Sequence, residues 1–186
     1  MKQGFLFVIS GPSAVGKTSV ASEILKREKK LSRIITCTTR AIRKGEINGA
    51  DYYFISVNEF LQHKNNKDFA EYAEVYGNYY GVLLSTIKEK IDNGLNSLLV
   101  VNWKGYLKIK HTFKKQVIGF FLVPPSINDL ETRIRGRGTD SEEVIAHRME
   151  MITEDMQHKD EFEFCIENVK IDETASNILE IINEYE

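Results

Sequence analysis

The sequence predicts an α/β fold, in which a mainly parallel sheet is flanked by helices and carries a small α+β insertion and a helical lid. Continuous apolar runs at 5–9, 97–102 and 117–123 are typical of strands that are buried on both faces of a parallel sheet. Segments with helical spacing of apolar residues lie between these runs, and such alternation favours an α/β architecture. The segment 36–82 breaks the alternation because its strands alternate polar and apolar residues, which predicts an inserted unit with one solvated face.

The 186 residues are expected to form one domain, which is long enough to bury a substantial core. The core is expected over about 1–35, 95–125 and 158–186. The insertion is expected over about 36–94 and the lid over about 126–157.

Each expected element has a local reason. The run at 5–9 forms the first strand, and Val20 and Ile24 then fall on one face of a helix. Gly94 is placed as the C-terminal stop of a helix over about 85–93. In chain order the further elements are a strand at 33–40, a strand at the end of 41–56, a helix over about 58–66, a hairpin over 69–82 that turns at Gly77 and Asn78, the strand 97–102, a helix over roughly 103–113 and the strand 117–123.

The C-terminal third is expected to be mostly helical. The stretch "SINDLETRIRG" places Leu130 and Ile134 on one apolar side. Thr139 and Glu142 have the spacing of a capping box, so the next helix is expected to start there. That helix presents Ile145, Met149, Ile152 and Met156 on one face, and a short strand in "FCIEN" and a helix over about 174–186 follow.

The composition is that of a folded protein and excludes several function classes. Hydrophobic residues make up 42% and charged residues 28%, and the net charge of −2 offers no global basic field for nucleic acid. Cys37 and Cys165 match no metal spacing and indicate buried thiols in a reducing compartment. No apolar stretch approaches ~18 residues, and no signal-peptide pattern is found. We therefore expect a cytoplasmic protein, monomeric or weakly homo-oligomeric, without a membrane or nucleic-acid partner.

The stretch "ISGPSAVGKTSV", residues 9–20, matches the pattern G-x-x-x-x-G-K-[ST] in full. Glycines let the backbone approach an anion closely, and the amide groups at the start of the following helix carry partial positive charge. A lysine there reaches the β- and γ-phosphates of a nucleotide, and a threonine can bind Mg²⁺. The pattern therefore predicts an ATP-phosphate loop made of Gly11, Pro12, Ser13, Ala14, Val15, Gly16, Lys17 and Thr18, with Thr18 as the metal ligand.

A second group of donors indicates a site for another phosphate. Arg40 and Arg43 stand close to Thr36 and Tyr52 around a glycine-containing turn, and the planar guanidinium fork suits a phosphate monoester. Glu71 follows in "EYAEVYGNYYG", and one carboxylate can accept both the N1–H and N2–H₂ groups of guanine, which adenine lacks. The alternatives are a solvated basic turn for the arginines and a solvent-facing strand residue for the glutamate.

A third basic cluster predicts a lid over the nucleotides. Arg133, Arg135, Arg137 and Arg148 gather around a hinge at 136–138. Phosphoryl transfer spreads negative charge over the equatorial oxygens, so cations that close over them lower the barrier. Closure also excludes water, which competes as an acceptor. The alternative is a solvated basic helix end.

Five stretches carry a resemblance that covers roughly residues 4–175. They are "GPSAVGKT", "TTRAIRKGEINGADYYF", "FAEYAEVYGNYYG", "PPSINDLETRIRGRGTDSEEVIAHRM" and "IEN", and their order and spacing are similar to those of guanylate kinases, a family of P-loop nucleoside monophosphate kinases. The resemblance implies the reaction ATP + GMP ⇌ ADP + GDP with Mg²⁺, in purine nucleotide metabolism. It also implies a P-loop core domain, a GMP-binding insertion and a lid.

The resemblance implies roles for particular residues. Lys17, Arg137 and Arg148 are expected to be catalytic, and Arg133 and Asn168 join the loop residues and Arg137 in binding ATP. The expected GMP-binding set is Thr36, Arg40, Arg43, Tyr52, Glu71, Tyr80, Val82 and Asn102.

Three positions depart from the family pattern on the acceptor side. The strand after Gly94 ends with Val100 and Asn102 where the family carries two aspartates, and Val82 stands where a Ser or Thr can donate to guanine O6. An unmade bond to a buried acceptor costs about 1–3 kcal/mol. Ala14, which replaces a loop glycine, is a milder change. We therefore predict retained ATP binding and transfer, with weaker or less selective GMP binding.

Two other readings remain open. A catalytically weak guanylate-kinase-like module can bind phosphopeptides through the same second phosphate site, although such modules generally lack an intact loop of the kind at 11–18. A kinase for another phosphorylated sugar is the second reading, and Glu71 with "GNYYG" argues for guanine instead.

Overall fold

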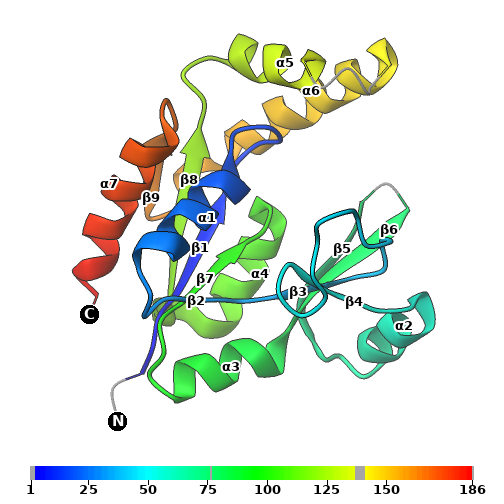
Figure 1. Cartoon of the computed structure of the whole chain (residues 1–186), viewed down its shortest axis with the longest axis vertical. Coiled ribbons are helices and arrows are strands. Elements are labelled where there is room, and N and C mark those ends of the chain that lie inside the picture. Colours follow the sequence, from blue (N-terminus) through cyan, green and yellow to red (C-terminus); the bar gives the residue numbers. More distant parts are fainter. Residues whose placement is uncertain (1–2, 76, 137–140, 186) are drawn as a thin grey trace.

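A computed structural model of the chain describes residues 3–75, 77–136 and 141–185. Within these residues the strands form one five-stranded and one four-stranded sheet, and helices flank both (Figure 1). The predicted α/β class, with a parallel sheet flanked by helices, is confirmed.

The five-stranded sheet forms the core, and all of its strands are parallel. Its central strand β1 (Leu6–Ser10) is buried along its whole length, as the apolar run predicted. Leu6 and Val8 pack on one face of the sheet while Phe7 and Ile9 pack on the other. The strand order is β2 (Ser32–Arg33), β7 (Ser97–Val100), β1, β8 (Val117–Val123) and β9 (Phe164–Glu167).

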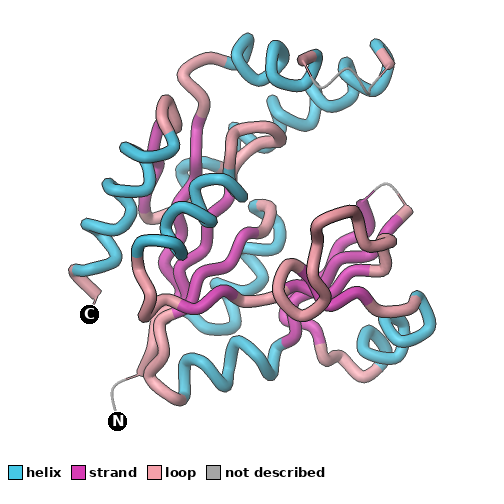
Figure 2. Tube along the Cα trace, viewed as in Figure 1, coloured by secondary structure: helices cyan, strands magenta, loops and turns pink. Residues whose placement is uncertain are grey.

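Helices cover both faces of this sheet (Figure 2). On one face α1 (Lys17–Arg27) packs beside α7 (Ile171–Asn183), where Ile24 and Ile178 are fully buried. On the other face α3 (Leu84–Asp92) and α4 (Trp103–Phe113) bury residues such as Ile87 and Tyr106. Short 3₁₀ helices, η1 (Lys114–Gln116) and η2 (Lys159–Glu161), precede β8 and β9.

The four-stranded sheet lies beside the core in the order β4 (Tyr52–Phe54), β3 (Thr36–Thr38), β6 (Asn78–Leu83) and β5 (Phe69–Val75). The β3–β4 pair is parallel, and the other pairs are antiparallel. The helix α2 (Val57–Asn65) covers one face, where Phe60 stacks on Phe69 with ring centroids 4.5 Å apart. Glu71 and Val82 of the same sheet are also buried, whereas several other residues of β5 and β6 stay partly exposed.

The helices α5 (Ile127–Arg135) and α6 (Glu142–Gln157) follow β8 and extend on the side of the sheet where β1 ends (Figure 1). The expectation that α6 starts with a capping box at Thr139 is wrong, because Ser141 is the N-cap and its hydroxyl accepts from the amide of Val144. Thr139 itself lies outside the described residues. The apolar face predicted for α6 is present, since Ile145 and Ile152 are buried.

Three other element boundaries differ from the predictions. The expected strand 33–40 is two strands in different sheets, because the chain leaves the core after Ile34, whose amide donates to Leu98. The strand expected over 97–102 ends at Val100, since Asn102 caps α4. The last helix begins at Ile171, and Thr174 is buried inside its first turn. Within the described ranges no helix is long and apolar enough to cross a membrane.

Candidate active site

The predicted phosphate loop, residues 11–18, joins β1 to α1. Gly11 and Gly16 have φ of 139° and 103°, which favour glycine. A Cβ on Gly11 would lie 2.4 Å from the carbonyl oxygen of Leu122, so this position excludes any side chain. Ala14 also has a left-handed φ, of 64°, which costs a residue with a Cβ about 1 kcal/mol. The loop backbone therefore has a conformation that requires glycine at two positions, directly before the first amide groups of α1.

Lys17 opens α1 and folds back over the loop. Its Nζ donates to the carbonyl oxygens of Gly11 and Pro12, at 2.8 Å each. Burial lowers the pKa of Lys17 to about 8, and the nearby Asp155 carboxylate opposes that shift. Thr18 follows with an exposed side chain. The carbonyl groups of Gly11 and Pro12 therefore hold the Lys17 amine at the loop, and the phosphates of a bound nucleotide would take their place as its hydrogen-bond acceptors.

Asn168 stabilises the loop through a hydrogen bond to its backbone. It is buried, and its Nδ2 donates to the carbonyl oxygen of Val15 at 2.7 Å. Its Oδ1 accepts from the Thr174 hydroxyl at 2.8 Å. Both ends of the amide therefore have protein partners, and a contact between Asn168 and adenine stays a prediction.

A cavity of about 530 Å³ opens beside the loop; we call it the donor cavity. Lys17, Thr18, Asn168 and Arg133 line it, and Arg133 reaches the carbonyl oxygen of Ala14 at 3.5 Å. Arg148 lies half-buried on α6. Arg137 lies outside the described residues. Of the predicted lid arginines, Arg133 is thus the one that the structure brings to the donor cavity among the described residues.

The α6 helix also contacts the start of α4 next to the loop. The Trp103 side chain donates to Asp155, the carboxylate that faces Lys17, and the rings of Trp103 and His158 stack 3.3 Å apart. Burial raises the pKa of Asp155. Sequence reasoning missed Asp155, because only the fold brings α6 to residue 17.

The predicted acceptor-phosphate residues gather around Glu46. The Arg40 guanidinium binds both Glu46 oxygens, at 2.7 and 3.0 Å, and lies 5.4 Å above the Tyr52 ring. These hydrogen bonds lower the pKa of Glu46 to about 2. Glu46 also accepts from the amide of Arg43, whose side chain is exposed. Tyr80 hydrogen-bonds to Arg40, so the structure does bring Arg40, Tyr52 and Tyr80 together.

Glu46 is a residue that sequence reasoning did not assign. It stands in the quoted stretch "RKGE", but an exposed turn glutamate gave no reason to expect a bidentate contact. The contact orients the Arg40 fork and fixes the turn that carries Arg43. The position of a glutamate three residues after an arginine was the available signal.

Glu71, Val82 and Asn102 meet where β5 and β6 approach the start of α4. Glu71 and Val82 are paired across the two strands, and Glu71 packs against Gly105, where a Cβ would lie 2.8 Å from its carboxyl carbon. Glu71 is only 7% exposed, and no hydrogen bond to its carboxylate is found within the described part of the chain. Burial raises the pKa of Glu71 to about 7, against the opposing charge of Lys108.

Val82 and Asn102 each have a structural partner. Val82 is fully buried among the apolar residues of the core face that α3 and α4 cover. The Oδ1 of Asn102 accepts from the amide of Gly105 at 2.8 Å and so caps α4. Both positions are predicted to touch the acceptor base, and their present contacts are with the protein.

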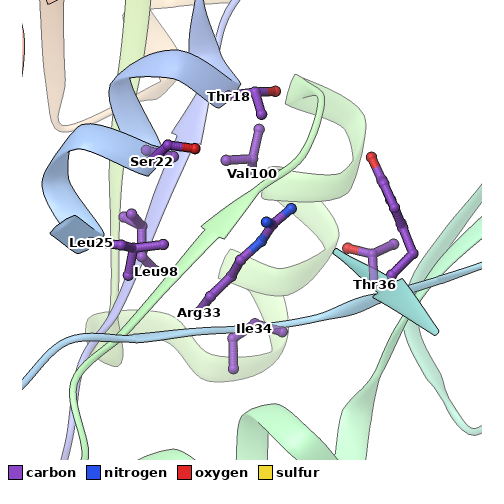
Figure 3. Close-up of a pocket in the computed structure, with 10 residues that line it drawn as sticks. Thr18, Ser22, Leu25, Arg33, Ile34, Thr36, Leu98 and Val100 are labelled. Carbon is purple, nitrogen blue, oxygen red and sulfur yellow. The ribbon is translucent and has the colours of Figure 1, made fainter. Parts of the chain in front are cut away.

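A second, smaller cavity joins the two halves of the site; we call it the central cavity (Figure 3). Thr18 of the loop, Thr36 and Tyr52 of the four-stranded sheet and Val100 at the end of β7 all line it. One cavity therefore connects the predicted ATP loop with the predicted acceptor-phosphate residues.

The fold and the site define a class: a P-loop α/β enzyme that phosphorylates nucleoside monophosphates. The family model described as guanylate kinase matches residues 3–185. The guanylate kinase of Carboxydothermus hydrogenoformans is 42% identical over 98% of this chain and 88% of its own length, and that of Anaplasma phagocytophilum is 38% identical over 96% and 86%. The crystal structure of the Anaplasma phagocytophilum guanylate kinase superposes with a TM-score of 0.81 at 32% identity, covering 98% of this chain and 86% of that one. The chain belongs to the guanylate kinase family.

These relatives all carry the name of the enzyme. The comparisons therefore give no support to the alternative of a phosphopeptide-binding module.

Proposed function

We propose that this chain transfers the γ-phosphoryl group of ATP to GMP and releases ADP and GDP. The central cavity carries the proposal, because Thr18 of the phosphate loop and Thr36 and Tyr52 of the acceptor site line the same space. In-line transfer needs the two phosphates end to end, and a shared cavity between two anion sites supplies that arrangement.

The donor side is expected to bind ATP through the loop amides and Lys17. The desolvated amine of Lys17, with its pKa near 8, is charged at neutral pH and can move from the carbonyls of Gly11 and Pro12 to the phosphates. Arg133, Arg137 and Arg148 would add positive charge from the lid, where the transferring group carries its negative charge. Asn168 would hold the loop in place.

Magnesium would bind with ATP at Thr18. The fit is partial: the Thr18 side chain is exposed at the start of α1 and lines both cavities, whereas Val100 at the end of β7 offers no oxygen. Bound Mg²⁺ supplies charge neutralisation between the β- and γ-phosphates. The residues of this chain would supply one hydroxyl ligand and leave the remaining positions to phosphate oxygens and water.

The acceptor side is expected to hold the GMP phosphate with Thr36, Arg40, Arg43, Tyr52 and Tyr80. The attacking atom is an oxygen of that phosphate, whose second pKa of about 6 leaves it mostly dianionic at pH 7. Its lone pair forms the bond to the γ-phosphorus while the bond to the ADP oxygen breaks, so no proton must move and no general base is required.

Glu71 is proposed to read guanine, next to the positions of Val82 and Asn102. A buried carboxylate without a hydrogen-bond donor in the described part of the chain is costly, and the N1–H and N2–H₂ groups of guanine would supply the missing hydrogen bonds. Val82 cannot donate to guanine O6, and the Asn102 oxygen already caps α4. We therefore expect weaker or less selective GMP binding than a full set of polar contacts would give.

The proposed organisation is a core over about 1–35, 95–125 and 158–186, an acceptor insertion over about 36–94 and a lid over about 126–157. The separate four-stranded sheet and the α5–α6 pair support these limits. The enzyme would work in the cytoplasm as a monomer or weak homo-oligomer. Its two cysteines are free, which fits a reducing compartment, but only Cys37 is buried; Cys165 is exposed, against the expectation that both thiols are buried.

A coupled assay of ADP release with GMP, AMP, CMP and UMP tests the proposal. Turnover with GMP well above the other three is expected. Equal rates with all four, or turnover with ribose bisphosphate instead of GMP, would contradict it. Adding dGMP and IMP measures base selectivity, and a GMP Michaelis constant in the low micromolar range with sharp rejection of IMP would contradict the expected loss of selectivity.

A further inference from the structure

Arg33 is a charged residue that lines the central cavity and is not among the expected site residues. It ends β2, where it pairs with Leu98 of β7. Its side chain lies along an apolar floor that includes Leu25 and Leu98, and its guanidinium group points between Val100 and Thr36 (Figure 3). The cation therefore stands between the phosphate loop and the acceptor site.

The charge of Arg33 is only loosely paired. Its Nη1 lies 3.9 Å from Oδ1 of Asp51, whose other oxygen accepts from the amide of Ile47. The matching distance in the Arg40–Glu46 pair is 2.7 Å. The side chains of Arg33 and Asp51 are both more than a third exposed, at 35% and 40%. An ion pair this exposed contributes little to stability. Arg33 thus lines the cavity with a charge that Asp51 neutralises only weakly.

The walls of the cavity suit an anion of the size of a phosphate group. Four residues that carry hydroxyl groups, Thr18, Ser22, Thr36 and Tyr52, line the same cavity as Arg33, and Val100 contributes no negative charge. The cavity measures about 50 Å³, and a water molecule needs roughly 10–15 Å³, so a phosphate group fits. A carboxylate at position 100 would instead neutralise Arg33.

We propose that Arg33 binds the phosphate group of the acceptor nucleotide from the floor of the central cavity. The inference rests on the proposed function and adds a third arginine to Arg40 and Arg43. Arg40 is clamped by Glu46, whereas Arg33 brings a charge that Asp51 neutralises weakly. A guanidinium on an apolar floor attracts a phosphate dianion more strongly than one in water. It offsets part of what Val82 and Asn102 fail to supply at the base.

Equilibrium binding of GMP, guanosine and ATP to Arg33→Met tests the proposal without turnover. We expect the dissociation constant for GMP to rise about ten- to a hundredfold, and those for guanosine and ATP to stay within about twofold. Arg33→Lys, which keeps the charge and loses the fork, should fall between. Lys29→Met removes one exposed charge just before β2 and is the matched control. Melting temperatures show that each variant folds.

Several results would overturn the inference. One is a GMP affinity of Arg33→Met equal to that of Lys29→Met, and another is an equal loss for guanosine and GMP. Weakened ATP binding with unchanged GMP binding would assign Arg33 to the donor instead. If the parent protein fails to bind GMP at all, the proposed function itself fails, which this set of measurements distinguishes from a failure of Arg33 alone.

A double-mutant cycle with Val100→Asp gives an independent check. The family pattern alone predicts that an aspartate at position 100 improves GMP binding. If Arg33 binds the phosphate, the new carboxylate should instead pair with Arg33 and weaken GMP binding about tenfold in the parent, with a smaller effect in the Arg33→Met background. Tighter GMP binding by Val100→Asp, or the same change in both backgrounds, would contradict the proposed use of Arg33.

Discussion

The donor and acceptor halves of the site are built in different ways. The donor half consists of backbone at the end of a fully buried parallel strand, where Gly11 and Gly16 leave little freedom for other residues. The predicted acceptor half consists of side chains from a small, partly exposed sheet and from the loop between β3 and β4, where Glu46 holds Arg40. A backbone site depends on the core fold, whereas a side-chain site can be rearranged one residue at a time.

The positions where this chain departs from the guanylate kinase pattern follow that difference. Val82 and Asn102 belong to the predicted acceptor half, and each has a local structural role, in the core and as a helix cap. The departure in the donor loop, Ala14, is the milder one, and Val82 and Asn102 are expected to change what the acceptor base contacts without moving the phosphate loop. Variants that change one half at a time therefore test whether the two halves act independently.

Lys17→Met should nearly abolish phosphoryl transfer, by about a thousandfold or more, because among the described residues no other cation contacts the carbonyls of Gly11 and Pro12. The melting temperature should not fall, since a desolvated amine with its pKa lowered to about 8 adds no stability at neutral pH. Steady-state rates and thermal unfolding measure the two effects. Guanosine binding should be unchanged, and Lys29→Met is the control. Turnover above a tenth of the parent rate would refute the assignment of Lys17.

Glu71→Gln should weaken GMP binding about ten- to a hundredfold and leave ATP binding unchanged, because an amide cannot accept both guanine donors. In the parent the GMP affinity should rise with pH through about 7, as the Glu71 carboxylate ionises. Calorimetric titrations at several pH values measure both. Equal losses of GMP and ATP affinity would show that the donor and acceptor halves are coupled and do not act independently.

Much of this site followed from sequence, and the missing parts share a cause. The loop at 11–18 is local, so its glycines, Lys17 and Thr18 were all found from spacing, and the strand, helix and hairpin order followed from periodicity. Arg33 and Asp155 gained their surroundings from contacts between segments far apart in the chain, and no local pattern marks such contacts. The cap at Ser141 was missed for a local reason. Thr139 and Ser141 both carry a hydroxyl that can cap a helix, and sequence propensity does not fix the end of a helix to within two residues.

The buried Glu71 also predicts how stability depends on pH. Its folded pKa of about 7 lies above the ordinary 4.5, so the folded state binds more protons between these values and the free energy of unfolding falls as pH rises. The loss reaches about 3 kcal/mol above pH 7. Glu71→Gln should therefore be more stable than the parent at pH 8 and equal to it at pH 4. Denaturant titrations of both proteins across this range measure the difference, and parallel curves would contradict the raised pKa.

Val82→Thr should improve the acceptor half by about tenfold in GMP affinity and in selectivity for GMP over AMP, because a hydroxyl that can donate to guanine O6 becomes available beside Glu71. Without ligand the same hydroxyl is buried in an apolar cluster, so the unliganded protein should lose about 1 kcal/mol of stability. Binding and unfolding measurements together test this exchange. Val82→Ala, which adds no hydroxyl, is the control, and equal selectivity of the two variants would remove Val82 from the base site.

Ala14→Gly is the smallest expected change and tests the donor half. At φ of 64° an alanine is strained by about 1 kcal/mol, and glycine removes this strain. Glycine also makes the unfolded chain more flexible, which offsets part of the gain, so the free energy of unfolding should rise by about 0.5 kcal/mol. Ala21→Gly, inside α1, is the matched control and should lose about 1 kcal/mol. GMP affinity should not change in either variant. A loss of stability in Ala14→Gly as large as that of Ala21→Gly would show that the loop carries no strain at Ala14. The backbone of the donor half would then not be more constrained than the acceptor half at this residue.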